Sequence, residues 1–469
     1  MAKKKKTIED LINDAEQGDV DFSLFNMQED LQLKEMNDKH AFIDFVGGKS
    51  MVMCRVYNAV YNKEMIEFVS VDTIKQQYCN RSIELVGKDG VKFVEQGVWW
   101  LKNSGRRTYK TIVFDPSQPK EHMGCLNMWE GFKVEPKKGT WKRAKKHIWN
   151  ILCNKDPVIF KYVMKWFVWC VQNPHERAEV ALIFKGKQGA GKGLILTQFV
   201  ELFGAHGTQI AQRDHLTGKF SGHLKKIVFL YADEAYYPGD KEVEGNLKNL
   251  ITESVVTRES KFMDPVLDKN RLHIVMSTNN EWVIPASQDS RRFFINKIDD
   301  RYAKGSATDA SRKRYFTPIW IEMNNGGREA MLYDLLKYDL KGWHPRDNVP
   351  ETKELLQQQY MSMTRADRCI LNLLENGFFP GEYVGMDRWA VPSRTLLDYI
   401  NELDEDAKKI SEKSKILILQ SLGVHRTRNA KTRMLEFPSL KEVREKWNEN
   451  HPPGDWDISE QWQVSKTSY

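Results

Sequence analysis

The sequence lacks the features that mark secreted, membrane-spanning and zinc-binding proteins. Its 469 residues hold only six cysteines, which are scattered and form no Cys-x2-Cys pair. Neither a disulfide framework nor a zinc site is therefore expected. No stretch of eighteen consecutive apolar residues occurs, so no membrane span is expected. The basic run Lys3–Lys6 leads into a polar segment, unlike a signal peptide. These absences favour a protein of the reducing cytoplasm.

The chain also lacks a large excess of charge of either sign. Its 71 lysine and arginine residues stand against 64 aspartate and glutamate residues, which gives a net charge of +7. A mildly basic balance of this kind permits a nucleic-acid partner without requiring one. The sequence leaves open whether its three basic clusters are solvated faces or nucleic-acid contacts; they lie at Lys3–Lys6, Lys133–Lys146 and His425–Arg433.

Changes in composition and periodicity divide the chain into six segments. We expect a flexible charged leader, an α+β module, a helical collar, a core, a helical extension and a C-terminal domain, at 1–25, 26–118, 119–178, 179–300, 301–363 and 364–469. In the last segment three predicted helices precede a basic, hairpin-like stretch. That order is typical of a winged-helix unit, and a plain helical cap is the alternative. Local patterns also predict a strand at Glu67–Val71 and helices at Trp141–Cys153, Pro157–Gln172, Arg365–Asn376, Ser393–Leu403 and Lys408–Leu422.

The most informative stretch is a glycine-rich turn between two apolar runs. The run Val180–Lys185 predicts a buried strand, and Leu194–Val200 predicts a helix. Between them stands Gly-Lys-Gln-Gly-Ala-Gly-Lys-Gly, residues 186–193. A strand, a loop and a helix in this order form the context of a phosphate-binding loop. The N–H groups of such a loop converge on an anion at the helix N-terminus.

Individual roles follow from this pattern. We predict that Gly186 and Gly191 take backbone dihedrals that a Cβ atom would forbid. Lys192 is placed to reach the β- and γ-phosphates. The residue after that lysine is Gly193, so the hydroxyl that usually contacts Mg²⁺ is missing. A strand–helix connection without a ligand is the alternative. The predicted nucleotide contacts are Gly186, Gln188, Gly189, Ala190, Gly191, Lys192 and Gly193.

Two carboxylates follow a later apolar run. Their separation in sequence from the glycine-rich turn is typical of proteins that hydrolyse nucleotides. The run Ile227–Ala232 predicts a strand that ends in Asp233 and Glu234. We expect Asp233 to hold Mg²⁺, directly or through water. We expect Glu234 to polarise the attacking water. An ordinary buried strand with an acidic turn is the alternative interpretation.

Further polar positions complete the predicted site. The run Leu272–Thr278 predicts a strand that ends in Asn279, whose amide can bind both the attacking water and the γ-phosphate; Asn280 is the alternative. Arg291 and Arg292 then precede two phenylalanines. An arginine finger neutralises charge on the transferred phosphoryl group. Such a finger usually reaches the nucleotide of a neighbouring subunit, which implies a ring.

Taken together, residues 125–300 resemble superfamily 3 helicases, and more narrowly the helicase part of phage and mobile-element primase–helicases. The resemblance is carried by motifs in a fixed order, at Leu126–Pro136, Val180–Gly193, Leu216–Phe220, Ala232–Ala235, Leu247–Glu253 and Asp289–Phe293. It implies an α/β P-loop NTPase core of the AAA+ type, with ATP and Mg²⁺ as cofactors. It also implies a hexamer that moves 3′ to 5′ along single-stranded DNA at a replication fork.

The resemblance further implies a DNA-contacting hairpin, formed here by Val255–Phe262 and Val266–Arg271. Within it, Lys261 and Lys269 are the expected phosphate contacts, and Phe262 is a weaker candidate. Phosphate contacts give a grip that is independent of sequence and sensitive to salt. Two exposed loop lysines without a ligand are the alternative.

The family's primase half is not evident, because the N-terminal module is short and lacks the acidic motif of such enzymes. We therefore expect a helicase that acts in the cytoplasm of a bacterial host and meets a separate primase or polymerase. Two rival interpretations stay open. One is another P-loop DNA motor, for packaging or partition. The other is a non-catalytic, DNA-binding replication initiator in which Gly193 leaves Mg²⁺ unheld.

Overall fold

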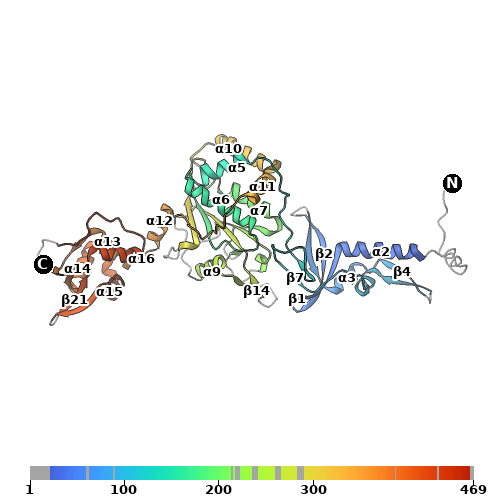
Figure 1. The fold of residues 1–469 in the computed structure, drawn as a ribbon, viewed down its shortest axis with the longest axis horizontal. Helices are drawn as coiled ribbons and strands as arrows, with labels where there is room; N and C mark the ends of the chain where they lie inside the picture. The colour runs from blue at the N-terminus through green and yellow to red at the C-terminus, as the bar shows by residue number, and fades with distance from the viewer. Residues whose placement is uncertain are drawn as a thin grey trace. The chain divides into compact units, whose positions relative to one another are not determined.

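The structure is a computed structural model. It describes residues 22–59, 63–87, 90–212, 215–216, 222–234, 241–258, 266–281, 290–385, 387–429 and 432–464. The chain separates into two compact units, Met1–Glu130 and Gly131–Tyr469, which Figure 1 shows from blue to red along the chain. Among the described helices, none is long and apolar enough to cross a membrane.

The first unit combines a long helix with small sheets in which most strand pairs are antiparallel. Its main sheet has the order β3-β2-β1-β6, and only the β1–β6 pair is parallel. Trp100 and Ile74, both fully buried, lie in its core. The elements are α2 (Phe22–Lys39), β1 (His40–Val46), β2 (Lys49–Asn58), β3 (Lys63–Val69), α3 (Val71–Gln77), β4 (Ser82–Gly87), β5 (Gly90–Glu95), α4 (Gln96–Lys102), β6 (Thr108–Tyr109), β7 (Ile112–Val113), β8 (Glu121–His122) and β9 (Cys125–Asn127).

One strand boundary in this unit was predicted wrongly. The expected strand Glu67–Val71 ends at Val69, and Val71 is already the first residue of α3. The cause is Ser70, whose side chain accepts a hydrogen bond from the N–H of Thr73 at 3.1 Å. A serine in this position satisfies a backbone donor that the helix itself leaves without a partner.

The second unit is built on a five-stranded parallel sheet. Its order is β11-β12-β15-β10-β16, with all neighbours parallel. Every residue of β10 and of β15 is buried, which explains why these strands read as continuous apolar runs. The strands are β10 (Ala181–Lys185), β11 (Gly207–Ile210), β12 (Phe229–Asp233), β15 (His273–Thr278) and β16 (Phe293–Lys297).

The strand order creates a switch point at β10. After β10 the chain passes through α7 (Lys192–Phe203) to β11 at one edge of the sheet. After the neighbouring strand β15 it runs to β16 at the opposite edge. In open parallel sheets, ligands bind outside the carboxyl ends of strands whose connections diverge in this way. The topology therefore marks the ends of β10 and β15 as the place to look for a site.

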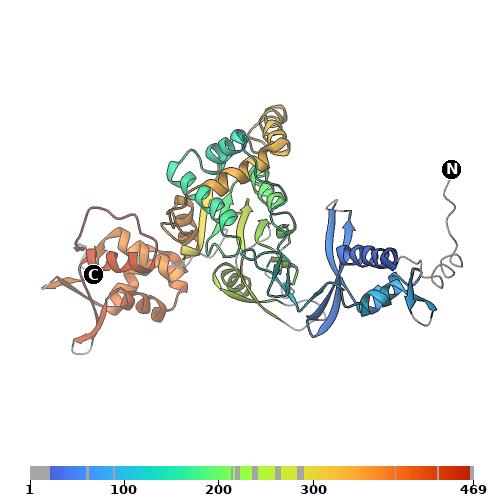
Figure 2. The same cartoon turned by 45° about the vertical axis from the view of Figure 1, so that its right-hand side comes forward.

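Helices surround this sheet, as Figures 1 and 2 show. Helix α6 (Pro157–Gln172) has the predicted bounds, and its cap is the Asp156 carboxylate, which accepts from the N–H of Val158 at 2.8 Å. Its Phe167 stacks on Phe199 of α7 with ring centroids 4.1 Å apart. The other elements are α5 (Lys142–His147), α9 (Lys241–Thr252), β13 (Val255–Arg258), β14 (Val266–Lys269), α10 (Asp309–Glu322) and α11 (Arg328–Lys337).

Of two helices predicted as continuous, one is confirmed and one is broken. The expected helix Trp141–Cys153 is helical from Lys142 to Leu152, as α5 followed by a wider, π-type turn at Ile148–Leu152. The expected helix Lys408–Leu422 is broken near Ser411, whose hydroxyl accepts from the N–H of Ser414 at 3.2 Å and starts a new helix. Serine favours a cap over a helix interior because its side chain competes for backbone hydrogen bonds.

The C-terminal part has its own hydrophobic core, which includes the buried residues Trp447 and Phe379. Four of its strands form an antiparallel sheet in the order β18-β19-β21-β20. Helix α16, one of its helices, was not predicted, and neither was α12 (Lys353–Ser362), which precedes this part and places Leu355 in the core of the parallel sheet. The elements of the C-terminal part are α13 (Arg365–Asn376), β17 (Phe378–Phe379), β18 (Glu382–Gly385), β19 (Arg388–Pro392), α14 (Ser393–Leu403), α15 (Glu412–Ser421), β20 (His425–Asn429), β21 (Thr432–Phe437), α16 (Leu440–Asn450) and β22 (Gln463–Val464).

Candidate functional site

The candidate site begins at the glycine-rich loop between β10 and α7. Gly189 and Gly191 have φ angles of +76° and +104°, in the left-handed region that favours glycine. A Cβ atom at Gly191 would lie 2.7 Å from Cε1 of His147 and 2.8 Å from Cε1 of Phe316. The loop thus needs glycine at this position both for its backbone angle and for the close packing around it.

Gly186 serves the loop in a different way from the one predicted. The expectation of a forbidden dihedral is wrong, because Gly186 is not among the residues with positive φ. Instead, a Cβ atom there would lie 2.5 Å from Cγ1 of Ile298 and 2.9 Å from Oδ1 of Asp300. The Asp300 carboxylate also accepts the N–H of Lys187 at 2.8 Å. The segment that follows β16 therefore holds the start of the loop closely.

Lys192 is the first residue of α7, and its side chain turns back over the loop. It is 7% exposed. Its ammonium donates to the carbonyl oxygens of Gly186 and of Lys187, the latter at 3.2 Å. Burial lowers the pKa of Lys192 below its ordinary value, while the charges of Glu234 and Asp233 act in the opposite direction. The lysine and the acidic end of β12 consequently share one electrostatic environment.

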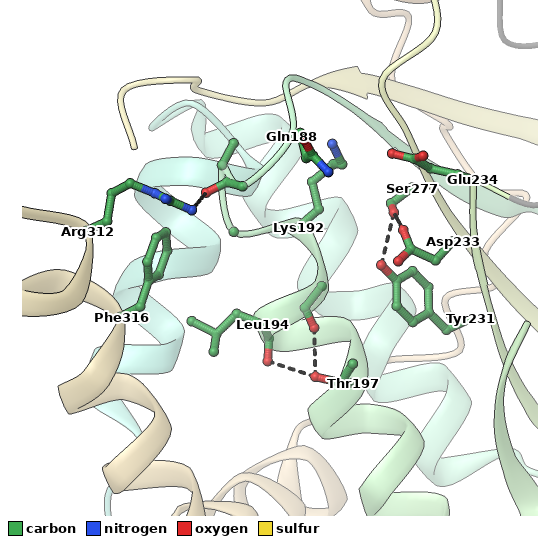
Figure 3. A pocket seen from close by; sticks show the side chains of 14 residues that line it. Gln188, Lys192, Leu194, Thr197, Tyr231, Asp233, Glu234, Ser277, Arg312 and Phe316 are labelled. Carbon is green, nitrogen blue, oxygen red and sulfur yellow. Dashed lines mark hydrogen bonds between the residues drawn. The ribbon is translucent and has the colours of Figure 1, made fainter. Parts of the chain in front are cut away.

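A cavity of about 560 Å³ lies beside this lysine. Figure 3 shows Lys192 between two groups of side chains, with Arg312 and Phe316 on one side and Asp233 and Glu234 on the other. The lining comes from the loop, α7, β12, β15 and α10, and consists of Gln188, Gly189, Ala190, Gly191, Lys192, Gly193, Leu194, Thr197, Tyr231, Asp233, Glu234, Ser277, Arg312 and Phe316. The fold thus gathers most of the predicted loop residues around the two predicted carboxylates.

Asp233 is held by a chain of hydroxyl groups. Ser277 on β15 donates its hydroxyl hydrogen to Asp233, and the Tyr231 hydroxyl lies 2.9 Å from Oγ of Ser277. Burial raises the pKa of Tyr231, so its phenol stays protonated and can donate. A Cβ atom at Gly193 would lie 3.3 Å from that phenol oxygen. A hydroxyl thus stands beside the position where phosphate-binding loops usually carry serine or threonine.

Glu234 has a strained backbone. Its φ angle is +54°, in a region that residues with a side chain rarely adopt. Its N–H donates to the carbonyl oxygen of Ser277 at 2.9 Å, which ties it to the neighbouring strand. Strain of this kind costs about 1–3 kcal/mol and persists where the surrounding structure enforces it, often at functional sites. The geometry therefore fixes the direction in which this carboxylate leaves β12.

The sequence interpretation missed the wall that α10 supplies. Arg312 and Phe316 are half-buried and line the cavity. The Arg312 guanidinium donates to the carbonyl of Tyr302 at 3.2 Å and to the Asp309 carboxylate at 3.1 Å, and it lies 3.5 Å from the carbonyl oxygen of Gly189. Arg312 and Phe316 are four residues apart, a spacing that puts both on one face of a helix. This spacing was the signal in the sequence that could have indicated a shared surface.

His147 is packed against the same loop from α5. It is fully buried, and its Nε2 donates to the carbonyl oxygen of Gly191 at 3.0 Å. Its Nδ1 accepts from the Tyr315 hydroxyl at 3.1 Å. Burial lowers the pKa of His147 to about 4, so the ring is neutral near pH 7. The ring thereby supports the left-handed turn without adding charge to the cavity.

Other predicted site residues do not line this cavity. Asn279 follows β15 and is exposed, while Asn280 is half-buried and donates its N–H to Oγ1 of Thr278 at 3.1 Å. Arg291, exposed, and Arg292, half-buried, form a short 3-10 turn before β16. The strand residue that does reach the cavity from β15 is Ser277. Any role for the two arginines therefore lies outside this wall.

The predicted hairpin after α9 is present as β13 and β14, which pair antiparallel. Lys269 ends β14 opposite Val255 and is exposed. Lys261 and Phe262 lie outside the described residues. The remaining part of the hairpin also exposes Leu267, which is 73% accessible.

A buried ion pair connects β10 to α12, the helix that precedes the C-terminal part. Lys185, the last residue of β10, is 3% exposed. Its ammonium lies 2.6 Å from Oε1 of Glu354 on α12 and 2.8 Å from Oε2 of Glu281. Burial lowers the pKa of Lys185, but the hydrogen bonds to these two carboxylates outweigh it and raise the pKa overall. The lysine is therefore charged where the strand meets the loop.

Sequence comparisons relate the chain to a family of unknown function and to a phage protein. Residues 184–292 match the model of a family of unknown function, DUF5906. The chain is also 26% identical, over 193 residues, to the DNA Primase-polymerase of Nitratiruptor phage NrS-1. That alignment covers 39% of this chain and 27% of the phage protein, so the chain corresponds to about a quarter of this relative.

Structural comparisons extend over most of the chain. The apo structure of the NrS-1 C terminal region matches with a TM-score of 0.61 at 17% identity, covering 86% of this chain and 97% of that one. An A form apo structure of the same region matches with the same TM-score over 87% and 98% of the two chains. The chain therefore shares the mixed α/β fold with a parallel sheet seen in that region.

Proposed function

We propose that this chain is an ATP-dependent DNA helicase of a phage, with a P-loop NTPase core of the AAA+, superfamily 3 type. The observation that carries the proposal is the cavity that joins Lys192, Asp233 and Glu234 at the carboxyl ends of a parallel sheet. The relation to a phage protein named a DNA primase-polymerase supports a role in phage DNA replication.

The cavity fits a nucleoside triphosphate in size and in chemistry. Its volume of about 560 Å³ lies within the range of roughly 300–1,000 Å³ that is usual for small-molecule sites. The loop from Gly189 to Gly193 opens onto the N-terminus of the twelve-residue helix α7, where N–H groups and the helix dipole favour phosphate. Lys192 would exchange two carbonyl partners for phosphate oxygens, which suits a charged donor better.

The carboxylate of Asp233 would hold Mg²⁺ with the help of water, because magnesium is usually bound by one or two carboxylates and retains several waters. Bound magnesium neutralises charge on the phosphoryl group in transfer. The hydrogen bond from Ser277 orients Asp233 for this task. The absence of a hydroxyl at Gly193 is consistent with this arrangement, since Tyr231 and Ser277 supply hydroxyls to the same corner of the cavity.

Glu234 would orient the attacking water as a general base. Its fixed, strained backbone limits the directions its carboxylate can take. Asn279, with Asn280 as the alternative, would bond to the water or the γ-phosphate from the end of β15. Arg312 adds a positive charge from the same chain on the opposite wall. An arginine near the phosphates can stabilise the charge that develops in the transition state.

Arg291 and Arg292 fit a role in a neighbouring subunit's site, because neither lines the cavity of its own chain. We therefore infer a ring, a hexamer on the superfamily 3 resemblance, with sites shared between subunits. Lys269, together with Lys261 and Phe262, would contact single-stranded DNA in the channel and support 3′ to 5′ movement. A separate primase or polymerase would act beside it.

The decisive experiment is a measurement of ATP hydrolysis with and without single-stranded DNA. We expect magnesium-dependent hydrolysis that single strands stimulate, and unwinding of a forked duplex that has a free 3′ single strand. No hydrolysis under any condition would favour the non-catalytic initiator. Hydrolysis stimulated only by intact duplex, without fork unwinding, would favour a packaging or partition motor.

A further inference from the structure

The hairpin of β20 and β21 carries three arginines on one face. Arg428 is paired directly opposite Arg433, and Arg426 is opposite Leu435. Directly opposed residues of an antiparallel pair project from the same side of the sheet. Leu435 is fully buried, so this is the side that packs against the helices. The hairpin continues past the helices of this part, as Figures 1 and 2 show. Arg428 and Arg433 form the pair next to its last described pair, Asn429 and Thr432.

This arrangement costs stability, and no residue that the structure describes forms a compensating ion pair with it. Like charges directly opposite each other across two strands are destabilising. Arg426, Arg428 and Arg433 are all exposed. Among the described residues, none of the three forms a salt bridge, whereas nearby Arg394 pairs with Asp398 at 3.2 Å. An arrangement that lowers stability, and that no interaction within the fold offsets, is expected at a functional site, where a bound ligand can supply the offsetting interaction.

A groove of about 640 Å³ lies between the hairpin and helices α14 and α15. Its polar lining is rich in arginine and hydroxyl groups and includes Ser393, Arg394, Arg426, Thr427, Thr432 and Arg433. Among the described residues that line it, Glu412 is the single acidic one; it lies 3.6 Å from NH1 of Arg394 and is partly neutralised by it. The groove therefore has an excess of positive charge and many hydrogen-bond donors.

The start of α14 adds to this character. The helix has eleven residues and begins at Ser393, inside the groove. The residue before it is Pro392, and no side chain caps the helix there. The first N–H groups of a helix and its dipole both attract anions. Together with the arginine pair, this makes the groove suited to phosphate groups.

We propose that this groove binds the phosphodiester backbone of duplex DNA. Arginine, serine and threonine side chains and helix N-termini are the groups that contact DNA phosphates. Sites for single strands instead rely on aromatic rings on which bases stack. None of the described residues that line this groove is aromatic, which favours a paired duplex over a single strand. DNA rather than RNA is favoured by the sequence relation to a DNA primase-polymerase.

The site is separate from the Lys192 cavity, so the inference does not depend on nucleotide hydrolysis. The test is equilibrium binding of a fluorescently labelled DNA duplex by the full chain without nucleotide, over a series of salt concentrations. The variant combines Arg426→Ala and Arg433→Ala, which remove two arginines of the groove lining, with Arg428→Ala, which removes the arginine directly opposite Arg433 at the edge of the groove. Its matched control is Arg388→Ala, because Arg388 is exposed on β19 of the same sheet and does not line the groove.

We expect the triple variant to bind duplex roughly a hundredfold more weakly at low salt, with a salt slope shallower by about two to three, close to one for each lost phosphate contact. Affinity for a single strand of the same length should change far less, and Arg388→Ala should match the unaltered chain. Unchanged duplex affinity would overturn the proposal, as would an equal loss for single strands or a clear preference for duplex RNA. Circular dichroism verifies that the variant is folded.

Discussion

Cationic side chains are hydrogen-bonded within the protein at the cavity, whereas on the C-terminal hairpin they lie opposite each other without a salt bridge to a described residue. At the cavity, Lys192 is bonded to two loop carbonyls and Arg312 to a carbonyl and a carboxylate. On the hairpin, Arg428 and Arg433 face each other without a salt bridge to any described residue. The first region is preorganised, so its charges already have fixed directions. In the second region the guanidinium groups remain exposed to a ligand, and their mutual repulsion lowers the stability of the hairpin.

The largest effect is expected at the preorganised charge. Lys192→Ala should lower ATP hydrolysis by roughly 10²–10³-fold or more, because it removes a positioned charge from the phosphates. The matched control is Lys187→Ala, whose side chain is exposed and does not line the cavity. The measurement is phosphate release at saturating ATP, with melting temperature as a check on folding. Normal turnover in Lys192→Ala would contradict the phosphate-loop proposal.

A second prediction extends the comparison to charges that act between subunits. Arg292→Ala and Glu234→Gln should each be inactive alone, and their mixture should recover part of the activity. The reason is that a shared site can take its arginine from one chain and its carboxylate from the next. The measurement is hydrolysis across a range of mixing ratios, repeated with Arg291→Ala. Absence of recovery at every ratio would count against shared sites.

A third prediction tests how the acidic end of β12 is held. Ser277→Ala removes the hydrogen bond that orients Asp233, and should raise the magnesium concentration for half-maximal hydrolysis roughly tenfold, as loss of a supporting hydrogen bond often does at metal sites. Thr197→Val is the control, because the Thr197 hydroxyl lines the same cavity but donates to the Gly193 carbonyl of its own helix, at 2.7 Å. Equal magnesium dependence in both variants would exclude the positioning role of Ser277.

A fourth prediction concerns pH. Burial lowers the pKa values of His147 and His273 from 6.5 to about 4. Below pH 6.5 these histidines are protonated in the unfolded chain but stay neutral in the folded chain. The free energy of unfolding should therefore fall as pH drops from about 6.5 to 4. The expected loss is up to about 3 kcal/mol for each histidine, at 1.36 kcal/mol per pKa unit. Melting temperatures at pH 7 and pH 5 provide the measurement.

The variant His147→Gln serves as the test of this cause. It should be less stable at pH 7, because the hydrogen bond to Gly191 is altered, yet its melting temperature should depend less on pH. A pH dependence equal to that of the unaltered chain would show that His147 is not one of the groups responsible.

The smallest effect is expected on the hairpin. Arg428→Glu replaces a repulsive pair with an attractive one opposite Arg433, and should stabilise the C-terminal part by roughly 0.2–1 kcal/mol. It should also weaken duplex binding, so stability and affinity move in opposite directions. Arg388→Glu is the control for the change in net charge. A lower melting temperature in Arg428→Glu than in that control would show that the opposed arginines do not repel each other.

The sequence predicted best what is decided locally. Helices α6, α13 and α14 have the predicted bounds. Side-chain caps start α6 and α13, and apolar spacing marks α14; both signals act within a few residues. Sequence-based prediction failed where a feature depends on contacts between residues that are distant in the sequence. Arg312 reaches the cavity from more than a hundred residues beyond the loop, and the need for glycine at position 186 arises from Ile298. Tyr231 and Ser277 were hidden as polar positions within apolar strand runs.

The buried ion pair between Lys185 and Glu354 connects the strand before the glycine-rich loop to the helix that precedes the C-terminal part. The strand that ends at Lys185 runs straight into the loop, and the helix that bears Glu354 opens the segment leading to the hairpin. Glu354→Ala would remove the buried partner of Lys185 and leave the largely exposed Glu281 as its remaining ion-pair partner. The loss of stability should therefore be smaller than the about 3–5 kcal/mol expected for a buried charge with no partner. The ion pair therefore fixes the first turn of α12, from which the chain continues to the C-terminal part, against the strand that enters the lysine loop.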